Sequence, residues 1–144
     1  MIEQDTIRLL RECDAGIKMG IASIHDVLEH VENKELYDKL SSCSDEHERL
    51  QSRVQGLLGK YRDEGKDPNP IAKGMSWMKT NVKLGMDAQD SVIADLMTDG
   101  CNMGVKSLNK YLNQYKAADE QTKDITKKLI KLEEELAMDI RKFL

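Results

Sequence analysis

The chain has few of the residues that interrupt helices or build sheets. Only two prolines occur in 144 residues, and aromatic side chains make up 4% of the chain, whereas 33% of its residues are charged. That composition is typical of long, solvent-exposed helices rather than of a sheet. The sequence therefore predicts an all-α protein that forms one domain over residues 1–144, a size that folds without disulfide bonds or a structural metal.

Cysteine pairs and long apolar runs are also lacking. Cys13, Cys43 and Cys101 are odd in number, far apart and without a CxxC spacing, which argues against a disulfide framework and for reduced thiols. No run of 18 or more apolar residues occurs, and the first residues, MIEQDTIRLLRECD, are acidic and polar. These features argue against a transmembrane span and a signal peptide, so we expect a cytoplasmic protein without a membrane partner.

An excess of positive charge and the usual catalytic motifs are absent as well. The formal net charge is −4, and basic residues are scattered among acidic ones along the sequence, so a nucleic-acid partner is not expected. The sequence contains neither a GxxxxGK[ST] phosphate loop nor a nucleophile-elbow pattern. We therefore favour a protein that is not an enzyme.

Apolar periodicity and helix breakers divide the chain into four long helices. The first should cover Ile2 to Val31, and the second should begin near Lys34, after an Asn33 cap, and stop by Glu64 at the breaker-rich segment DEGKDPNP. The third is expected over Ala88 to Tyr115, and the fourth after Asp119. A short amphipathic segment, Ile71 to Leu84, separates the second and third, so the pattern favours a ferritin-like four-helix bundle with one long crossover containing a short helix.

One polar residue interrupts the most regular apolar pattern. The inward-facing seam of the second helix is predicted to contain Leu36, Leu40, Cys43, His47, Leu50, Val54, Leu57 and Tyr61. A buried imidazole must be hydrogen-bonded, paired or metal-bound, because an unsatisfied buried polar group costs about 1–3 kcal/mol. His47 is thus a core histidine satisfied by Asp14 or another polar neighbour, a ligand of a metal or other cofactor, or a solvent-exposed residue on a rotated helix.

Counting residues from the turns places four polar or sulfur-bearing side chains at one level of the bundle, to within about one helical turn. They are Asp14, His47, Cys101 and Glu133. Dinuclear sites in such bundles use a Glu from each of two helices and Glu-x-x-His from each of the other two. All three histidines lie in the first two helices and Ser44 stands three residues before His47, so a standard dinuclear centre cannot be assembled.

Several stretches resemble the small bacterial ferritin-like proteins of unknown function that are related to rubrerythrins. The resemblance covers nearly the whole chain and rests on CDAGIKMGI (13–21), VENKELYDKL (31–40), the GKDPNP linker, a crossover bearing Trp77, SVIADLMTDGCNMGVKSLNKYL (91–112) and AMDIRKFL (137–144). It implies the ferritin-like fold. The relatives' Gly-Glu-Asp block reads Gly100-Cys101-Asn102 here, and Ala137 to Asp139 replaces an expected histidine.

These observations favour a non-enzymatic bundle with a degenerate dimetal site, no cofactor and a structural or protein-interaction role, present as a homodimer. The alternative is a metalloprotein with an atypical or mononuclear iron, manganese or zinc site built from Asp14, His47, Glu133 and Cys101, serving as an oxidase, a peroxidase or a metal store. Cys43 and His47, four residues apart, are a further possible zinc pair, although buried cysteines commonly act as small apolar residues. Methionines around the crossover form a candidate partner surface, with core packing as the other interpretation: Met75, Met78, Met86, Met97 and Met103.

Overall fold

The computed structural model describes residues 2–68 and 89–144, and these residues form a bundle of four long helices. The helices are α1 (Ile2–Leu28), α2 (Lys34–Lys60), α4 (Asp90–Gln114) and α5 (Glu120–Ile140), followed by a short 3-10 turn, η2 (Arg141–Phe143). No strand occurs in the two described ranges, which confirms the all-α prediction. None of the helices described there is long and apolar enough to cross a lipid bilayer.

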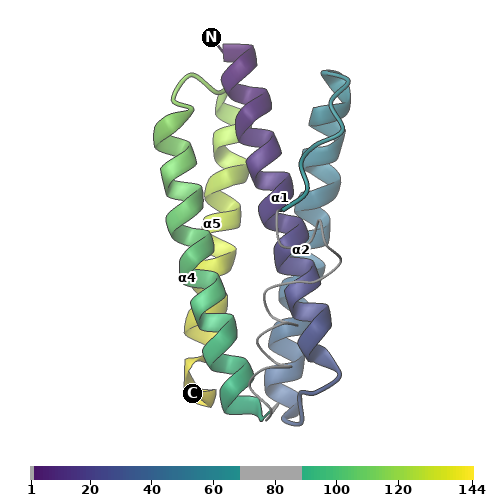
Figure 1. Cartoon of the computed structure of the whole chain (residues 1–144), viewed down its shortest axis with the longest axis vertical. Coiled ribbons are helices and arrows are strands. Elements are labelled where there is room, and N and C mark those ends of the chain that lie inside the picture. Colours follow the sequence, from purple (N-terminus) through teal and green to yellow (C-terminus); the bar gives the residue numbers. More distant parts are fainter. Residues whose placement is uncertain (1, 69–88) are drawn as a thin grey trace.

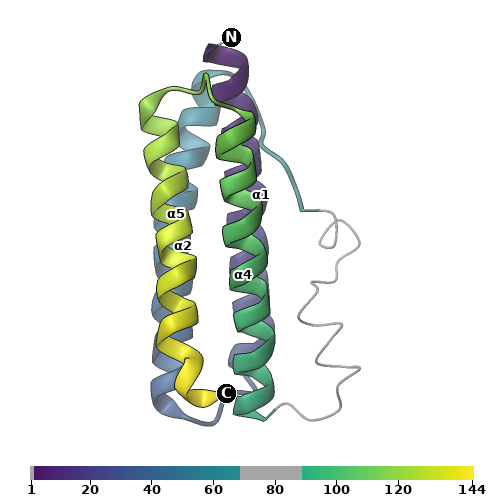
Figure 2. The same ribbon diagram turned by 90° about the vertical axis from the view of Figure 1, so that its left-hand side faces the viewer.

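The helices pair as two antiparallel hairpins that lie side by side, α1 with α2 and α4 with α5 (Figures 1 and 2). The carboxylate of Asp90, at the start of α4, accepts hydrogen bonds from the backbone N–H groups of Glu32 and Asn33 in the α1–α2 turn. At the opposite end, the N–H of Ala117 in the α4–α5 turn donates to Asp5 near the start of α1. Consequently α4 runs antiparallel to α1 and parallel to α2.

Side-chain caps fix where two of the helices begin. The Asn33 side chain accepts hydrogen bonds from the N–H groups at the start of α2, and Asp119 accepts one from Thr122 at the start of α5. Both starts agree with the sequence-based prediction. The predicted end of the first helix is wrong by three residues, because α1 ends at Leu28. Just after it, backbone N–H groups bond to carbonyl groups three residues earlier, and the chain turns towards the Asn33 cap.

After α2 the chain turns back and follows α1. Asp63 pairs with Arg11, and the next residues are held against the buried carboxylate of Asp14, which accepts a hydrogen bond from the Lys66 N–H at 3.0 Å. Gly65 makes this turn with a φ of 90°, and a Cβ there would lie 2.2 Å from Asp14 Oδ2. Only glycine fits this position. The predicted amphipathic crossover segment, residues 71–84, lies outside the described residues.

The apolar interior consists of two clusters separated by a polar layer. One cluster fills the end near the α1–α2 turn and the other fills the opposite end. Along α2 the first ends with Cys43 and the second begins with Leu50, with His47 between them; along α5, Glu133 lies in the corresponding gap. The inward seam predicted for α2 is confirmed from Leu36 to Val54, but Leu58 rather than Leu57 is the next fully buried residue.

Candidate functional site

His47 lies at the centre of the bundle, and both of its ring nitrogens are engaged. Its side chain is 1% exposed. Nε2 lies 2.7 Å from Glu133 Oε1 of α5, and Nδ1 lies 2.8 Å from the backbone oxygen of Cys43, one turn earlier in α2. The Glu133 bond joins the two helical hairpins through the middle of the molecule. Of the interpretations that the sequence left open, that of a buried histidine satisfied by a polar neighbour matches this geometry.

The surroundings of the ring favour the imidazolium form. Burial alone would lower the pKa of His47, but the contacts with Cys43 and Glu133 outweigh it and raise the pKa to about 10. In the protonated ring both nitrogens carry hydrogens, so Nδ1–H donates to the Cys43 carbonyl and Nε2–H donates to the Glu133 carboxylate. Together His47 and Glu133 form a buried ion pair.

Cys101 is a further member of the same layer. Its thiol, on α4, is 1% exposed and lies beside the Glu133 carboxylate. Burial and the adjacent negative charge raise the pKa of this thiol far above its usual value. A thiol held in the neutral form is a poor nucleophile, and Cys101 packs as a small buried side chain.

Asp14 belongs to another part of the structure. Besides accepting from the Lys66 N–H, it forms an ion pair with Lys18 at 2.8 Å. It lies six residues before Gly20, the α1 residue that packs against the His47 ring, which is about 9 Å along the helix axis. Three of the four expected site residues therefore meet at mid-bundle, while Asp14 anchors the chain that follows α2.

Both ring nitrogens of His47 are hydrogen-bonded. A histidine ligand must present an unprotonated nitrogen to the ion, so His47 would have to give up its contact with Glu133 to bind one through Nε2. Across the described ranges, no group of three or more His, Cys, Asp or Glu side chains could hold a metal ion.

Comparisons with known proteins add no relative. The chain matches no protein-family model, and no curated protein or solved structure shows significant similarity to it.

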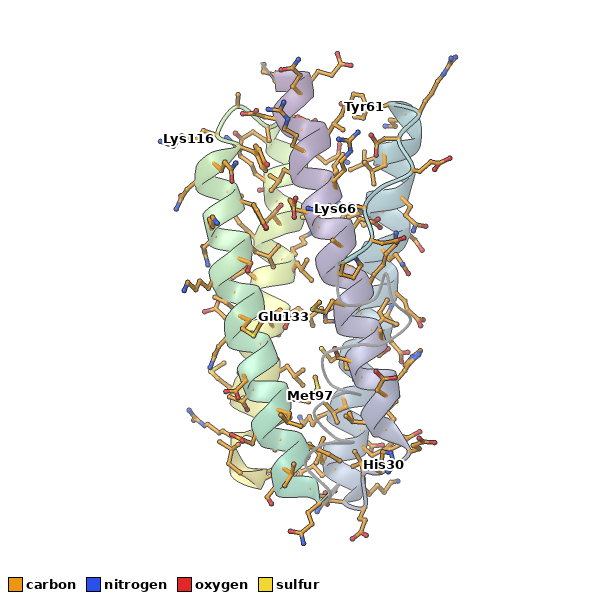
Figure 3. All side chains as sticks on the ribbon, in the orientation of Figure 1. His30, Tyr61, Lys66, Met97, Lys116 and Glu133 are labelled. Atoms are coloured by element: carbon orange, nitrogen blue, oxygen red, sulfur yellow. The ribbon has the colours of Figure 1, made fainter. Side chains whose placement is uncertain are left out.

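A groove of about 360 Å³ opens between α1 and α4 above the ion pair. Its wall is mainly apolar and includes Met19, Gly20 and Ile24 from α1, and Met97, Gly100, Gly104 and Leu108 from α4. His47 and Glu133 form its polar floor. In Figure 3, Lys66, Glu133 and Met97 mark successive levels along it, from the upper end of the bundle towards the lower.

Four glycines face the groove, two on each helix with a spacing of four residues: Gly16, Gly20, Gly100 and Gly104. A Cβ at Gly20 would lie 2.7 Å from His47 Nε2, so close packing against the ring requires this glycine. A Cβ at Gly16 or Gly100 would meet none of the described residues within 4 Å. A glycine inside a helix costs about 0.5–1 kcal/mol relative to alanine, and the close approach of the His47 ring explains why that cost is met at Gly20.

Basic residues gather more closely in space than the sequence suggests. Arg53 of α2 and three lysines of α5 line an exposed hollow together with Asp124 and Gln121; the lysines are Lys127, Lys128 and Lys131. The distribution of charge along the sequence did not single out this face. The helical repeat explains the difference, because residues three or four apart along α5 share one side of the helix.

Proposed function

We propose that this protein is a non-enzymatic, ferritin-like bundle with a degenerate metal site, and that it serves as a structural or protein-interaction module. The two parallel helices α2 and α4, which require a connection along the length of the bundle, support the ferritin-like assignment. The observation that carries the proposal is that both nitrogens of His47 are hydrogen-bonded, at the level where such bundles hold metals.

The ion pair supplies the link between hairpins that a metal would otherwise provide. Glu133 is 13% exposed and His47 1%, so the charges are mostly removed from water and compensate each other. Breaking such a pair to free a ligand leaves an uncompensated buried charge, which costs about 3–5 kcal/mol. Metal binding at His47 would have to overcome that cost as well as displace the proton.

Metal analysis tests this proposal directly. The full chain is produced in medium supplemented with iron, manganese and zinc, purified without chelators, and analysed for bound metal alongside His47→Ala and His30→Ala. His30 is a matched control because its side chain is 40% exposed and remote from the layer. We expect far less than one ion per chain in all three proteins. Near-stoichiometric metal that is lost in His47→Ala but kept in His30→Ala would refute the proposal.

A second candidate function is a metalloprotein with an atypical site. It is favoured by the proximity of ligand-type side chains: Cys43 Sγ lies 3.5 Å from His47 Nδ1, and Cys101 lies beside Glu133. This alternative requires that added iron, manganese or zinc raise the melting temperature and that EDTA reverse the effect. A melting curve indifferent to both treatments would count against it.

The interaction role includes self-association as a homodimer. Two large apolar side chains, Met103 of α4 and Met138 of α5, are 54% and 55% exposed, and exposed methionines are adaptable contact residues. Three of the methionines expected around the crossover, Met75, Met78 and Met86, lie outside the described residues. Light scattering over a range of concentrations tests this role, and a monomer at every concentration would contradict the dimer.

A further inference from the structure

Charged residues form two stripes on the face that α2 and α5 share. Taken at every fourth position, the α2 stripe consists of Asp45, Arg49 and Arg53, and the α5 stripe of Lys127, Lys131, Glu135 and Asp139, all of them exposed. Residues four apart lie on the same side of a helix, and Arg53 lines one hollow together with Lys127 and Lys131. Both stripes therefore border a single surface, the α2–α5 face.

The α2–α5 face lies on the opposite side of the bundle from the α1–α4 groove (Figure 2). Pro68, where the first described range ends, lines that groove, and the second range begins beside the start of α4. Every residue of the two stripes belongs to a described helix.

The sign of the charge reverses at one level on both helices. Along α2 it changes from negative to positive across His47, and along α5 it changes from positive to negative across Glu133. These two residues lie at the same level, because His47 Nε2 is 2.7 Å from Glu133 Oε1. Since α2 and α5 are antiparallel, the half of the face towards the α4–α5 turn is basic and the other half is acidic.

Such a face is complementary to itself. A two-fold rotation about an axis normal to the face at the level of His47 places the basic half of each copy on the acidic half of the other. The α5 helix of the second copy then lies over α2, and each α2 residue faces the α5 residue whose number is higher by 86, the separation of His47 and Glu133. Three opposite-charge contacts result, each formed twice by symmetry: Asp45 with Lys131, Arg49 with Glu135, and Arg53 with Asp139.

Two charges whose signs differ from those of their halves fit the same arrangement. Asp124 lies in the basic hollow, and Lys39 lies on the acidic half of α2, fourteen residues before Arg53. In the rotated pair they come within one residue of facing each other. Met138, seven residues after Lys131 and 55% exposed, adds an apolar side chain to the face.

Within a single chain the stripes are unfavourable. Like charges four residues apart destabilise a helix, and three such pairs occur: Arg49 with Arg53, Lys127 with Lys131, and Glu135 with Asp139. The ion pairs that these residues form within the chain, Arg49 with Glu46 and Lys131 with Glu135, are exposed and therefore weak. Opposite charges on a second copy relieve the repulsion at little cost.

We propose that two copies of the chain associate through their α2–α5 faces, related by a two-fold axis at the level of His47 and Glu133. This inference rests on the homodimer proposed above and assigns its interface. Because the contacts join exposed charges, the dissociation constant of the dimer should rise with ionic strength.

Sedimentation equilibrium of the full chain tests the interface with two charge reversals, Arg53→Asp and Asp139→Arg. Each single variant brings like charges together twice in a dimer, so its dissociation constant should be at least about tenfold higher than that of the parent protein. An equal mixture of the two variants should form a heterodimer about as tight as the parent dimer, because both contacts again join opposite charges. Within one chain the two positions are about 18 Å apart along the bundle, so the recovery must arise between copies.

Arg8→Asp is the matched control, because Arg8 is an exposed arginine of α1, and it should leave the dissociation constant unchanged. If the parent protein is a dimer and both reversals dimerise as it does, the α2–α5 assignment is overturned while the proposed homodimer stands. Weak association of the mixture, like that of the single variants, would overturn the two-fold arrangement. A parent protein that is monomeric at every concentration would contradict the homodimer as well, and the metal analysis is independent of each of these results.

Discussion

Replacing Glu133 by glutamine is the most direct test of the buried ion pair. The substitution keeps the shape and one carbonyl oxygen of the side chain but removes the charge that faces His47 Nε2 at 2.7 Å. The imidazolium then lies in the core without a counter-ion. We expect it to lose its proton near neutral pH, together with the stability that the proton confers.

The size of the effect follows from the pKa of His47. Burial opposes the charged ring, but its contacts with Cys43 and Glu133 raise the pKa from 6.5 to about 10. At about 1.4 kcal/mol per pKa unit, that difference corresponds to about 4 kcal/mol of stability at pH 7. Part of it comes from the contact with Cys43, which Glu133→Gln leaves in place. The variant should therefore lose about 2–4 kcal/mol, close to the cost of breaking other buried ion pairs.

The stability difference between the parent protein and Glu133→Gln should depend on pH. Because the folded-state pKa of His47 lies above its unfolded value, the ion pair stabilises the protein fully below pH 6.5, and this stabilisation is lost as the pH rises to about 10. Urea unfolding of the parent protein and of Glu133→Gln, followed by circular dichroism across this range, should show the largest difference at the acidic end and little difference near pH 10.

Glu134→Gln is the matched control. Glu134 is the next residue of α5 and is exposed, so its substitution should change the free energy of unfolding by no more than about 0.5 kcal/mol at any pH. A loss below about 1 kcal/mol in Glu133→Gln, or a loss that does not change with pH, would refute the buried-pair interpretation.

Substitutions at Gly20 and Asp14, each with a companion variant, test the packing of the central layer and the anchoring of the chain that follows α2. Gly20→Ala should destabilise the protein by about 1–3 kcal/mol in urea unfolding, because its Cβ would lie 2.7 Å from the His47 ring. Gly16→Ala on the same helix should instead stabilise the protein by up to about 1 kcal/mol. Equal effects of the two substitutions would contradict the close packing of Gly20. Asp14→Ala should lower the free energy of unfolding by about 1–3 kcal/mol, because it removes the acceptor of the Lys66 N–H and the partner of Lys18. Asp14→Asn keeps an acceptor and should lose less stability. If neither substitution changes thermal unfolding, the anchoring role of Asp14 is refuted.

The sequence predicted the helices and the central layer because both depend on local rules. Asn33 and Asp119 begin their helices by side-chain capping, which involves only the next few residues. The level of His47 followed from the 1.5 Å rise per residue counted from tight turns, and this arithmetic correctly brought it opposite Glu133 and near Cys101. Counting along straight, antiparallel helices accumulates little error.

Contacts that depend on rotation about a helix axis, or on an irregular segment, could not be obtained in this way. Asp14 lies within two turns of Gly20, but its carboxylate faces Gly65 and Lys66, whose path after α2 depends on a glycine with a positive φ. The groove was likewise missed. Its signal was present as the four-residue spacing of Gly16 and Gly20, but that spacing does not distinguish a glycine pressed against a ring from one whose Cβ would meet no described residue.

The position of the ion pair between two apolar clusters explains how the hairpins find one register. Apolar side chains in the two clusters would tolerate a shift of one hairpin along the other, because the hydrophobic effect has little directional preference. A shift by one turn would move Glu133 about 5.4 Å from His47 and leave both charges in an apolar layer. That penalty falls on every register except the observed one, as with a single buried polar residue in a coiled coil. On this reasoning, replacing both His47 and Glu133 by leucine should cost less stability than the sum of the single replacements, and should broaden the amide NMR signals of α4 and α5 as alternative registers become populated.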